Sequence, residues 1–320
     1  MGLKYTLAAT LNALLRPLGA RLERRDAPQA WQMTELVKRH AATVRQLHAI
    51  FSEHNPNLPA TVGREELLAN LVGTQVSEAL WIIRSLHEAL AAPGDICEFG
   101  IAEGATSALL ANEIRATERR LWLFDSFEGL SRPTAEDVLI DDIFQLGSMD
   151  AYAGKMSYPE AAARGRVAAV GFPASRLEIV PGFIETSIRG PRLPTSVAFA
   201  YVDFDFYEPI LVALRFLRKV MPAGGRIVVD DYGFFSAGAQ RAVDEFVGEC
   251  DGQFTLRLPQ PYYGHFAELL CQRATDESTR VWRRAPWLRG ARVRSTGAMV
   301  VTGVVGASGS STSVAVPTIP

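Results

Sequence analysis

The sequence predicts an α/β fold, a doubly wound, mostly parallel seven-stranded sheet with helices on both faces and a helical extension at the N-terminus. Two observations support this. After residue 94, short apolar runs alternate with helix-forming segments, and helix formers dominate the first 60 residues. Strand and helix in repetition are typical of parallel strands joined by crossover helices.

Composition sets limits on function. The chain has 320 residues, 48% of them hydrophobic, and a net charge of −2, which fits a globular protein with one large domain. This charge gives no global field that favours nucleic acid or an anionic membrane. The three cysteines lie far apart without metal-ligand spacing, which favours a reducing compartment. No apolar run approaches the roughly 18 residues of a membrane span, and the start lacks a secretory signal, so we predict a cytoplasmic protein.

The chain divides into three parts. Residues 1–60 form the predicted helical extension, which ends at the breakers Pro56, Pro59 and Gly63. Leucines at helical spacing in its first 25 residues fit a surface-seeking helix or one docked on its own domain or a partner, so a homo-oligomer through these helices is possible. Residues 61–273 form the main domain, in which the irregular segment 131–170 could cover a site. Residues 274–320 are Gly/Ser/Thr/Val-rich and predicted to be disordered.

The seven predicted strands account for the apolar runs of the main domain. In such a sheet, ligands bind beyond the carboxyl ends of the strands, at the switch point of strand order. The polar residues at the strand ends are therefore the candidates for a functional site. The predicted strands are "DICEFG", "RLWLFDSF", "RLEIVPG", "VAFAYVDFD", "GRIVVDDYG", "FTLRLP" and "AELLCQR".

The first two strand ends indicate a bound cofactor. Glu98, Gly100 and Gly104 form an E-x-G-x-x-x-G pattern before a helix, where glycines let backbone approach a ligand and free N–H groups face it. The spacing differs from the G-x-G-x-x-G of pyrophosphate binders, and a plain tight turn is the alternative. Asp125 ends the next strand, where this fold places an acid on ribose hydroxyls. Its alternative role is a helix N-cap, for which Ser126 competes.

Two further strands end in paired acids. Asp203 and Asp205 follow "VAFAYV", and Asp230 and Asp231 follow "GRIVV". If these strands are neighbours, three or four carboxylates converge and require a compensating cation or protons. Oxygen ligands of this kind suit Mg²⁺. The alternative is that an Asp here, Asp205 in particular, only caps a helix.

These blocks, in this order and spacing, resemble the macrocin O-methyltransferase family of class I, S-adenosylmethionine-dependent enzymes over residues 63–270. The blocks are "CEFGIAEGATS", "LWLFDSFEGL", "PGFIETS", "AYVDFDFYEP", "PAGGRIVVDDYG" and "RAVDEF". The resemblance implies a Rossmann-like fold. It implies that Glu98, Gly100 and Gly104 line the methionine end of the cofactor, Asp125 holds the ribose and Ser126 lies beside the adenine. It also implies that Gly182 and Phe183 shape the far wall, and that Thr74 and Glu78 lie in a segment that closes over the site.

Metal-dependent members of that family carry acids at matching positions, which assigns Asp203, Asp230 and Asp231 to Mg²⁺ and leaves Asp205 as a supporting or substrate residue. The predicted reaction moves a methyl group to a hydroxyl of a sugar or glycosylated metabolite, and Mg²⁺ would lower the pKa of that hydroxyl. Segment 131–170 contains no histidine. Asp203 is therefore the favoured general base, with Asp205 and Asp150 as alternatives.

Three other functions are weighed against this one. Asp203 to Asp205 also fits the D-x-D of metal-dependent glycosyltransferases, which predicts no role for the glycines at the first strand end. A nicotinamide oxidoreductase lacks its phosphate-binding glycine pattern here. A non-catalytic module with a methyltransferase fold would bind the cofactor without turning it over.

Overall fold

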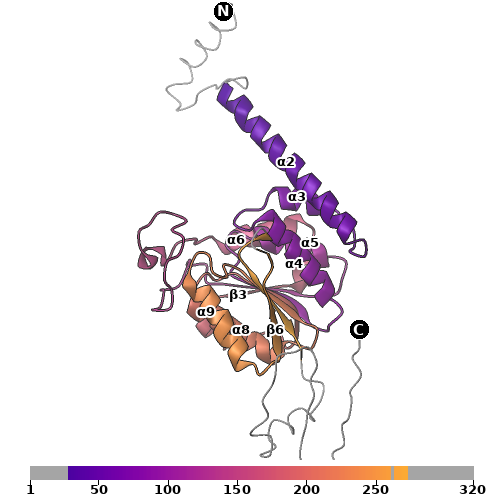
Figure 1. Cartoon of the computed structure of the whole chain (residues 1–320). Coiled ribbons are helices and arrows are strands. Elements are labelled where there is room, and N and C mark those ends of the chain that lie inside the picture. The colour runs from indigo at the N-terminus through magenta and orange to yellow at the C-terminus, as the bar shows by residue number, and fades with distance from the viewer. Residues whose placement is uncertain (1–27, 261–262, 273–320) are drawn as a thin grey trace, which may run out of the picture. The chain divides into compact units, whose positions relative to one another are not determined.

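The computed structural model describes residues 28–260 and 263–272 (Figure 1). A seven-stranded sheet of order β3-β2-β1-β4-β5-β7-β6 forms its centre. The pairs from β3 to β5 are parallel, and β7 runs antiparallel to both its neighbours. The predicted fold class is confirmed; the predicted tail, 274–320, lies outside the described residues. The strands are β1 (Asp95–Phe99), β2 (Leu121–Asp125), β3 (Leu177–Pro181), β4 (Val197–Val202), β5 (Arg226–Val229), β6 (Phe254–Arg257) and β7 (Ala267–Cys271).

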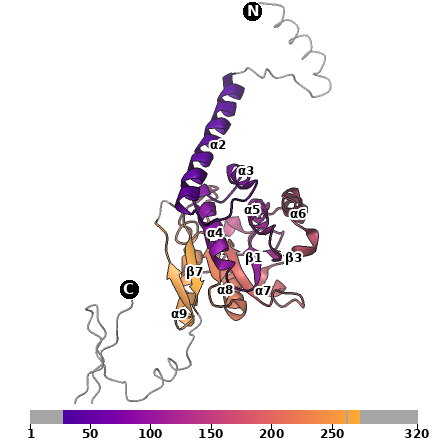
Figure 2. The ribbon, with the colours of Figure 1, turned by 90° about the vertical axis from the view of Figure 1, so that its right-hand side faces the viewer.

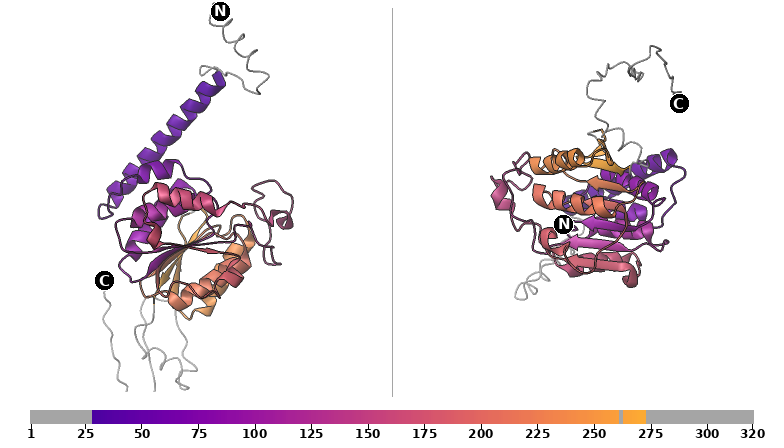
Figure 3. Two further views of the ribbon diagram at one scale, coloured as in Figure 1. Left: turned by 180° about the vertical axis from the view of Figure 1, so that it is seen from behind. Right: turned by 90° about the horizontal axis from the view of Figure 1, so that it is seen from below.

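Helices cover both faces of the sheet (Figure 3). One face packs against α4 (Val76–Ala89), α5 (Ala105–Ile114) and α6 (Glu160–Ala169), and the other packs against α7 (Ile184–Ser187), α8 (Tyr207–Val220) and α9 (Ala237–Glu249). Side chains alternate between the faces along each strand, so all of β4 is buried. The chain runs outward from β1 to β3 and then returns to β4 beside β1. The switch point therefore lies between the ends of β1 and β4.

The N-terminal extension contains α2 (Pro28–His54); α3 (Arg64–Ala69) follows it, and both helices lie beside α4 (Figure 2). Val44 of α2 is buried against Leu68 and Leu80. The buried Arg64 pairs with Glu113 of α5 at 2.6 Å, which ties α3 to the domain. Among the described helices, none is both long and apolar enough to cross a membrane.

The segment between β2 and α6 is an insertion that is tied to the domain. It contains a 3₁₀ turn, Met149–Tyr152, and a second turn, Ala174–Arg176, precedes β3. Tyr152 packs with Phe206 and Phe235. Asp137 accepts hydrogen bonds from the backbone N–H of Tyr207 at 2.8 Å and from Ser236 Oγ at 3.1 Å. The insertion is thus fixed to the first turns of α8 and α9.

Candidate active site

A cavity of about 350 Å³ opens at the carboxyl edge of the sheet, at the switch point. The ends of β1, β2, β4 and β5 and part of the insertion form its walls. Glu78, Gly104 and Gly182 were predicted as site residues but are not among the lining residues. The predicted residues that do line it are Thr74, Glu98, Gly100, Asp125, Ser126, Phe183, Asp203, Asp230 and Asp231.

Glu98 leaves a buried carboxyl oxygen without a partner. The residue is 1% exposed, and its Oε2 makes no hydrogen bond with the described residues. Burial raises the pKa of Glu98 to about 8, and the nearby charge of Asp125 adds to the effect. A cationic group in the cavity would pair with this oxygen and favour the ionised form. The amino group of a methionine-derived cofactor has that charge.

Asp125 joins the ends of β1 and β2. Its two oxygens accept the backbone N–H groups of Ile101 at 2.8 Å and Phe127 at 2.7 Å. It does not cap a helix, because β2 is followed by the insertion, and Ser126 Oγ donates to the carbonyl of Gly129 within a turn. Each carboxylate oxygen keeps a further lone pair for a ligand hydroxyl. The arrangement fits a ribose.

The glycines of the E-x-G-x-x-x-G pattern are required by contacts within the protein. A Cβ on Gly100 would lie 1.9 Å from the backbone oxygen of Asp203, and one on Gly104 would lie 2.6 Å from Cα of Ala163 in α6. Both glycines also have positive φ, 79° and 85°. Gly100 still lines the cavity, whereas Gly104 lets α6 pack closely on α5.

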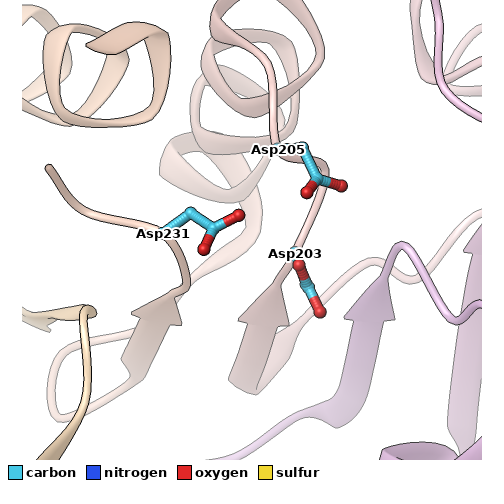
Figure 4. A group of neighbouring side chains, drawn as sticks. All are labelled: Asp203, Asp205 and Asp231. Carbon is cyan, nitrogen blue, oxygen red and sulfur yellow. The ribbon is translucent and has the colours of Figure 1, made fainter. Parts of the chain in front are cut away.

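Asp203, Asp205 and Asp231 form a compact carboxylate group, with one oxygen of each within 4.8 Å of the others (Figure 4). The predicted metal set had Asp230 in place of Asp205. Asp205 and Asp231 have φ of 62° and 57°, a left-handed backbone that residues with side chains rarely adopt and that is common at functional sites. Asp205 is not needed as the α8 cap, since Asp137 holds the N–H of Tyr207.

Asp230 lies behind this group, with its oxygens already bonded. Oδ1 accepts the backbone N–H of Asp231 at 2.8 Å, and Oδ2 accepts the hydroxyl of Tyr201 at 2.8 Å. The side chain of Glu78 shares a further hydrogen bond with Asp230. Glu78 is only 3% exposed. The structure therefore places Glu78 among the acids.

Five acids gather here, and among the described residues the charge of one basic side chain, His265, acts on Asp230. Burial, first, and the charges of neighbouring acids raise the pKa of Asp203 and Asp231, and burial also raises the pKa of Asp205, Asp230 and Glu78. Within the described ranges, no lysine or arginine forms an ion pair with any of them. The cluster must therefore hold protons or a cation, and its oxygen donors suit Mg²⁺.

Sequence reasoning missed two apolar residues of the insertion. Ile143 and Phe144 line the cavity although they are 40% and 50% exposed. The alternative base Asp150, in contrast, is exposed and does not line the cavity. The available signal was weak: two large apolar side chains in an otherwise polar and irregular segment.

Fold and site together define a doubly wound domain with a nucleoside-type acid after β2 and a carboxylate cluster after β4 and β5. The Macrocin-O-methyltransferase (TylF) family model matches residues 33–251, and the chain belongs to this family. The resemblance read from the motifs is confirmed.

Individual relatives agree with this family. The chain is 30% identical over 144 residues, 44% of its length and 53% of the relative's, to the 8-demethyl-8-(2,3-dimethoxy-alpha-L-rhamnosyl)-tetracenomycin-C 4'-O-methyltransferase of Streptomyces olivaceus. It is 25% identical over 162 residues, 50% and 60% of the two lengths, to the demethyldecarbamoylnovobiocin O-methyltransferase of Streptomyces niveus. The chain thus spans a little over half the length of these relatives. The solved O-methyltransferase NovP shares the fold, with a TM-score of 0.55, 18% identity and coverage of 73% of this chain and 100% of that one.

Proposed function

We propose that this protein is a cytoplasmic O-methyltransferase that moves a methyl group from S-adenosylmethionine to a hydroxyl of a sugar or glycosylated metabolite, with Mg²⁺ assisting. One observation carries the proposal: a single cavity joins a cofactor-type half, with Glu98 and Asp125, to a carboxylate cluster. The family of the chain and the names of its relatives support the same reaction.

The cofactor half has groups for each part of S-adenosylmethionine. When bound, this cofactor supplies a methyl group on a positively charged sulfur. Glu98 would accept hydrogen bonds from its amino group, and Asp125 from its ribose hydroxyls. Ser126 and Phe183 would border the adenine side, and Thr74, whose Oγ1 lies 2.9 Å from Thr106 Oγ1, would border the methionine side.

The acid half would hold the metal and accept the proton. Asp203 and Asp231 would bind Mg²⁺ with Asp205 or Asp230, and the ion would supply Lewis acidity to the acceptor hydroxyl. Asp203 is the proposed catalytic residue, because its backbone N–H bonds the carbonyl of Phe99 at 2.7 Å and so places it where the two halves meet. Its carboxylate would take the hydroxyl proton as the methyl group arrives.

The acceptor side is partly apolar. Ile143 and Phe144 of the insertion and Phe234, in the loop after β5, line the cavity. A sugar with an apolar substituent or aglycone would cover these side chains, whereas a purely polar glycan would leave them in water. We therefore propose a glycosylated small molecule as the acceptor.

The test is methyl transfer itself. The protein is incubated with S-adenosylmethionine, Mg²⁺ and a panel of rhamnosylated or otherwise glycosylated aromatic compounds, and products are searched by mass spectrometry for one added methyl group. Cofactor binding without any transfer would favour a non-catalytic module. Binding of a nucleotide sugar without binding of S-adenosylmethionine would favour the glycosyltransferase alternative.

We further propose that α2 pairs with α2 of a second copy. Its exposed apolar side chains form two pairs with a spacing of three, and the second pair follows the first by two heptads, so that all four lie on one side of the helix. The positions between the pairs in this register are His40 and Thr43. In an antiparallel pair the stripe matches itself, and two copies would bury on the order of 1,000 Å², the lower range of specific interfaces.

Light scattering should show a dimer that Leu36→Glu breaks and Lys38→Glu, on the polar side, does not. The apolar members are Met33, Leu36, Leu47 and Ile50, which are 62%, 60%, 40% and 54% exposed.

A further inference from the structure

We propose that Tyr201 is a positioning residue of the acid cluster, whose hydroxyl holds Asp230 and, through it, Asp231 in the arrangement that binds a divalent cation. The inference rests on the proposed metal site. It assigns a role to a residue that the sequence indicated only as part of a buried strand.

The hydroxyl of Tyr201 connects three elements of the fold. The side chain is fully buried, on the face of β4 that packs against α4. Its oxygen lies 2.8 Å from Oδ2 of Asp230, which follows β5, and 3.5 Å from Oε1 of Glu78 in α4. It also lies 3.4 Å from Oδ2 of Asp203, the residue that follows β4. Three carboxyl groups from different elements therefore surround one phenol oxygen.

The distances rank these contacts. A phenol has a single proton to donate, and 2.8 Å is an ordinary O–H···O distance, whereas 3.4 and 3.5 Å lie beyond that range. The donated bond therefore goes to Asp230. The other oxygen of Asp230 accepts the backbone N–H of Asp231, the residue with φ of 57°. Tyr201 thus fixes Asp230, and Asp230 fixes the turn that presents Asp231 to Asp203 and Asp205.

If Tyr201 only filled space in the core, its hydroxyl would not be needed. The ring of Tyr201 packs in an apolar cluster with Phe199 and Val228, and phenylalanine would fill the same space. A buried hydroxyl is unfavourable unless it has a hydrogen-bond partner, and here its partners are the acids. Groups that orient metal ligands from behind affect metal affinity about 10- to 100-fold in other proteins.

The experiment compares Tyr201→Phe with the wild type by calorimetric titration of Mg²⁺ and Mn²⁺ into the cofactor-free protein. We expect cation affinity to fall 10- to 100-fold. In turnover assays, the Mg²⁺ concentration for half-maximal rate should rise by a similar factor, and the rate at saturating Mg²⁺ should change much less. Tyr207→Phe is the matched control, since it also removes a phenol–carboxylate bond, to Glu245 at 2.6 Å, outside the cavity. Its cation affinity should equal that of the wild type.

A double variant tests the route through Asp230. Asp230→Asn combined with Tyr201→Phe should lose no more cation affinity than Asp230→Asn alone. Unchanged affinity in Tyr201→Phe overturns the proposal. If that variant does not fold, unchanged affinity in Asp230→Asn overturns it as well. A wild type that binds neither cation would remove the metal from the proposed function, and the positioning role with it, while methyl transfer could still be measured.

Discussion

The cavity has a cofactor half, at the ends of β1 and β2, and an acid half, at the ends of β4 and β5. The carboxylates of the two halves differ in the partners that compensate their charge. After β2, Asp125 accepts two backbone N–H groups and is held by the protein itself. After β4 and β5, Asp203, Asp205 and Asp231 face one another, and burial and mutual repulsion raise their pKa values. Asp125 is thus satisfied without a ligand. The charge of the acid cluster is compensated only by protons or a cation. Removal of a bound cation should therefore affect the acid cluster and leave Asp125 unchanged.

The largest expected effect comes from removing the metal. EDTA should lower turnover of the wild type by more than about 100-fold, because the acceptor hydroxyl would lose its Lewis acid, and excess Mg²⁺ should restore it. Cofactor affinity, measured by calorimetry, should change little, because the cofactor half has its own partners. Undiminished methyl transfer in EDTA would leave the acids with structural roles only.

Asp203→Asn should reproduce the loss in EDTA while the fold remains. The pKa of Asp203 is raised in the folded protein. Its contribution to stability is therefore full at a pH below the ordinary pKa of an aspartate, and it is lost as the pH rises through the raised pKa. At neutral pH the variant should therefore unfold at the same temperature as the wild type or a higher one. Asp244→Asn, which alters a surface bond to Tyr232, is the control for both measurements. A variant that keeps wild-type turnover would exclude Asp203 as ligand and base.

An intermediate effect is expected for Asp125→Ala in the other half. Loss of the acceptor for ribose hydroxyls costs about 1–3 kcal/mol, or roughly 5- to 150-fold in cofactor affinity. Mg²⁺ affinity should remain as in the wild type, which separates the halves. Asp125→Asn keeps one acceptor oxygen and should lose less. Equal cofactor affinity in all three proteins would show that Asp125 serves only the turn between β1 and β2.

Most of the fold was predictable from sequence because each strand is a short apolar run with a helix after it. The ends of neighbouring parallel strands must meet, so the convergence of Asp203 and Asp231 also followed from sequence. The approach of Asp205 to these two acids did not follow. It depends on positive φ at two positions and on Asp137, about 70 residues away, acting as the partner of the α8 N–H.

The glycines and Glu78 show a second limit. Their residue types matched the family pattern, but the structure gives Gly104 a contact with α6 and places Glu78 against Asp230. A pattern of residues along the chain does not say whether a glycine makes room for a ligand or for another helix. Burial of Glu78 by α4 packing on the sheet is likewise a tertiary effect.

The last expected effect is on stability and concerns Glu98, whose Oε2 lacks a partner among the described residues. Its pKa is about 8 against an ordinary 4.5, so its contribution to stability is full below about pH 4.5 and is lost as pH rises to about 8. Glu98→Gln imitates the protonated form. In cofactor-free protein, the unfolding free energy of the variant minus that of the wild type should increase as the pH rises from about 4.5 to about 8, by at most a few kcal/mol. A constant difference from pH 5 to pH 8 would contradict the raised pKa.

The same group predicts a proton count for cofactor binding. At pH 7, Glu98 is mostly protonated in the free protein, and the positive amino group of S-adenosylmethionine would favour its ionised form. Binding should therefore release about one proton, which calorimetry detects as a dependence of the binding enthalpy on the ionisation enthalpy of the buffer. Glu98→Gln should bind more weakly and release none, and the wild type should release less at pH 9, where Glu98 is already ionised. Equal proton release by wild type and variant would place the cofactor's amino group elsewhere in the cavity.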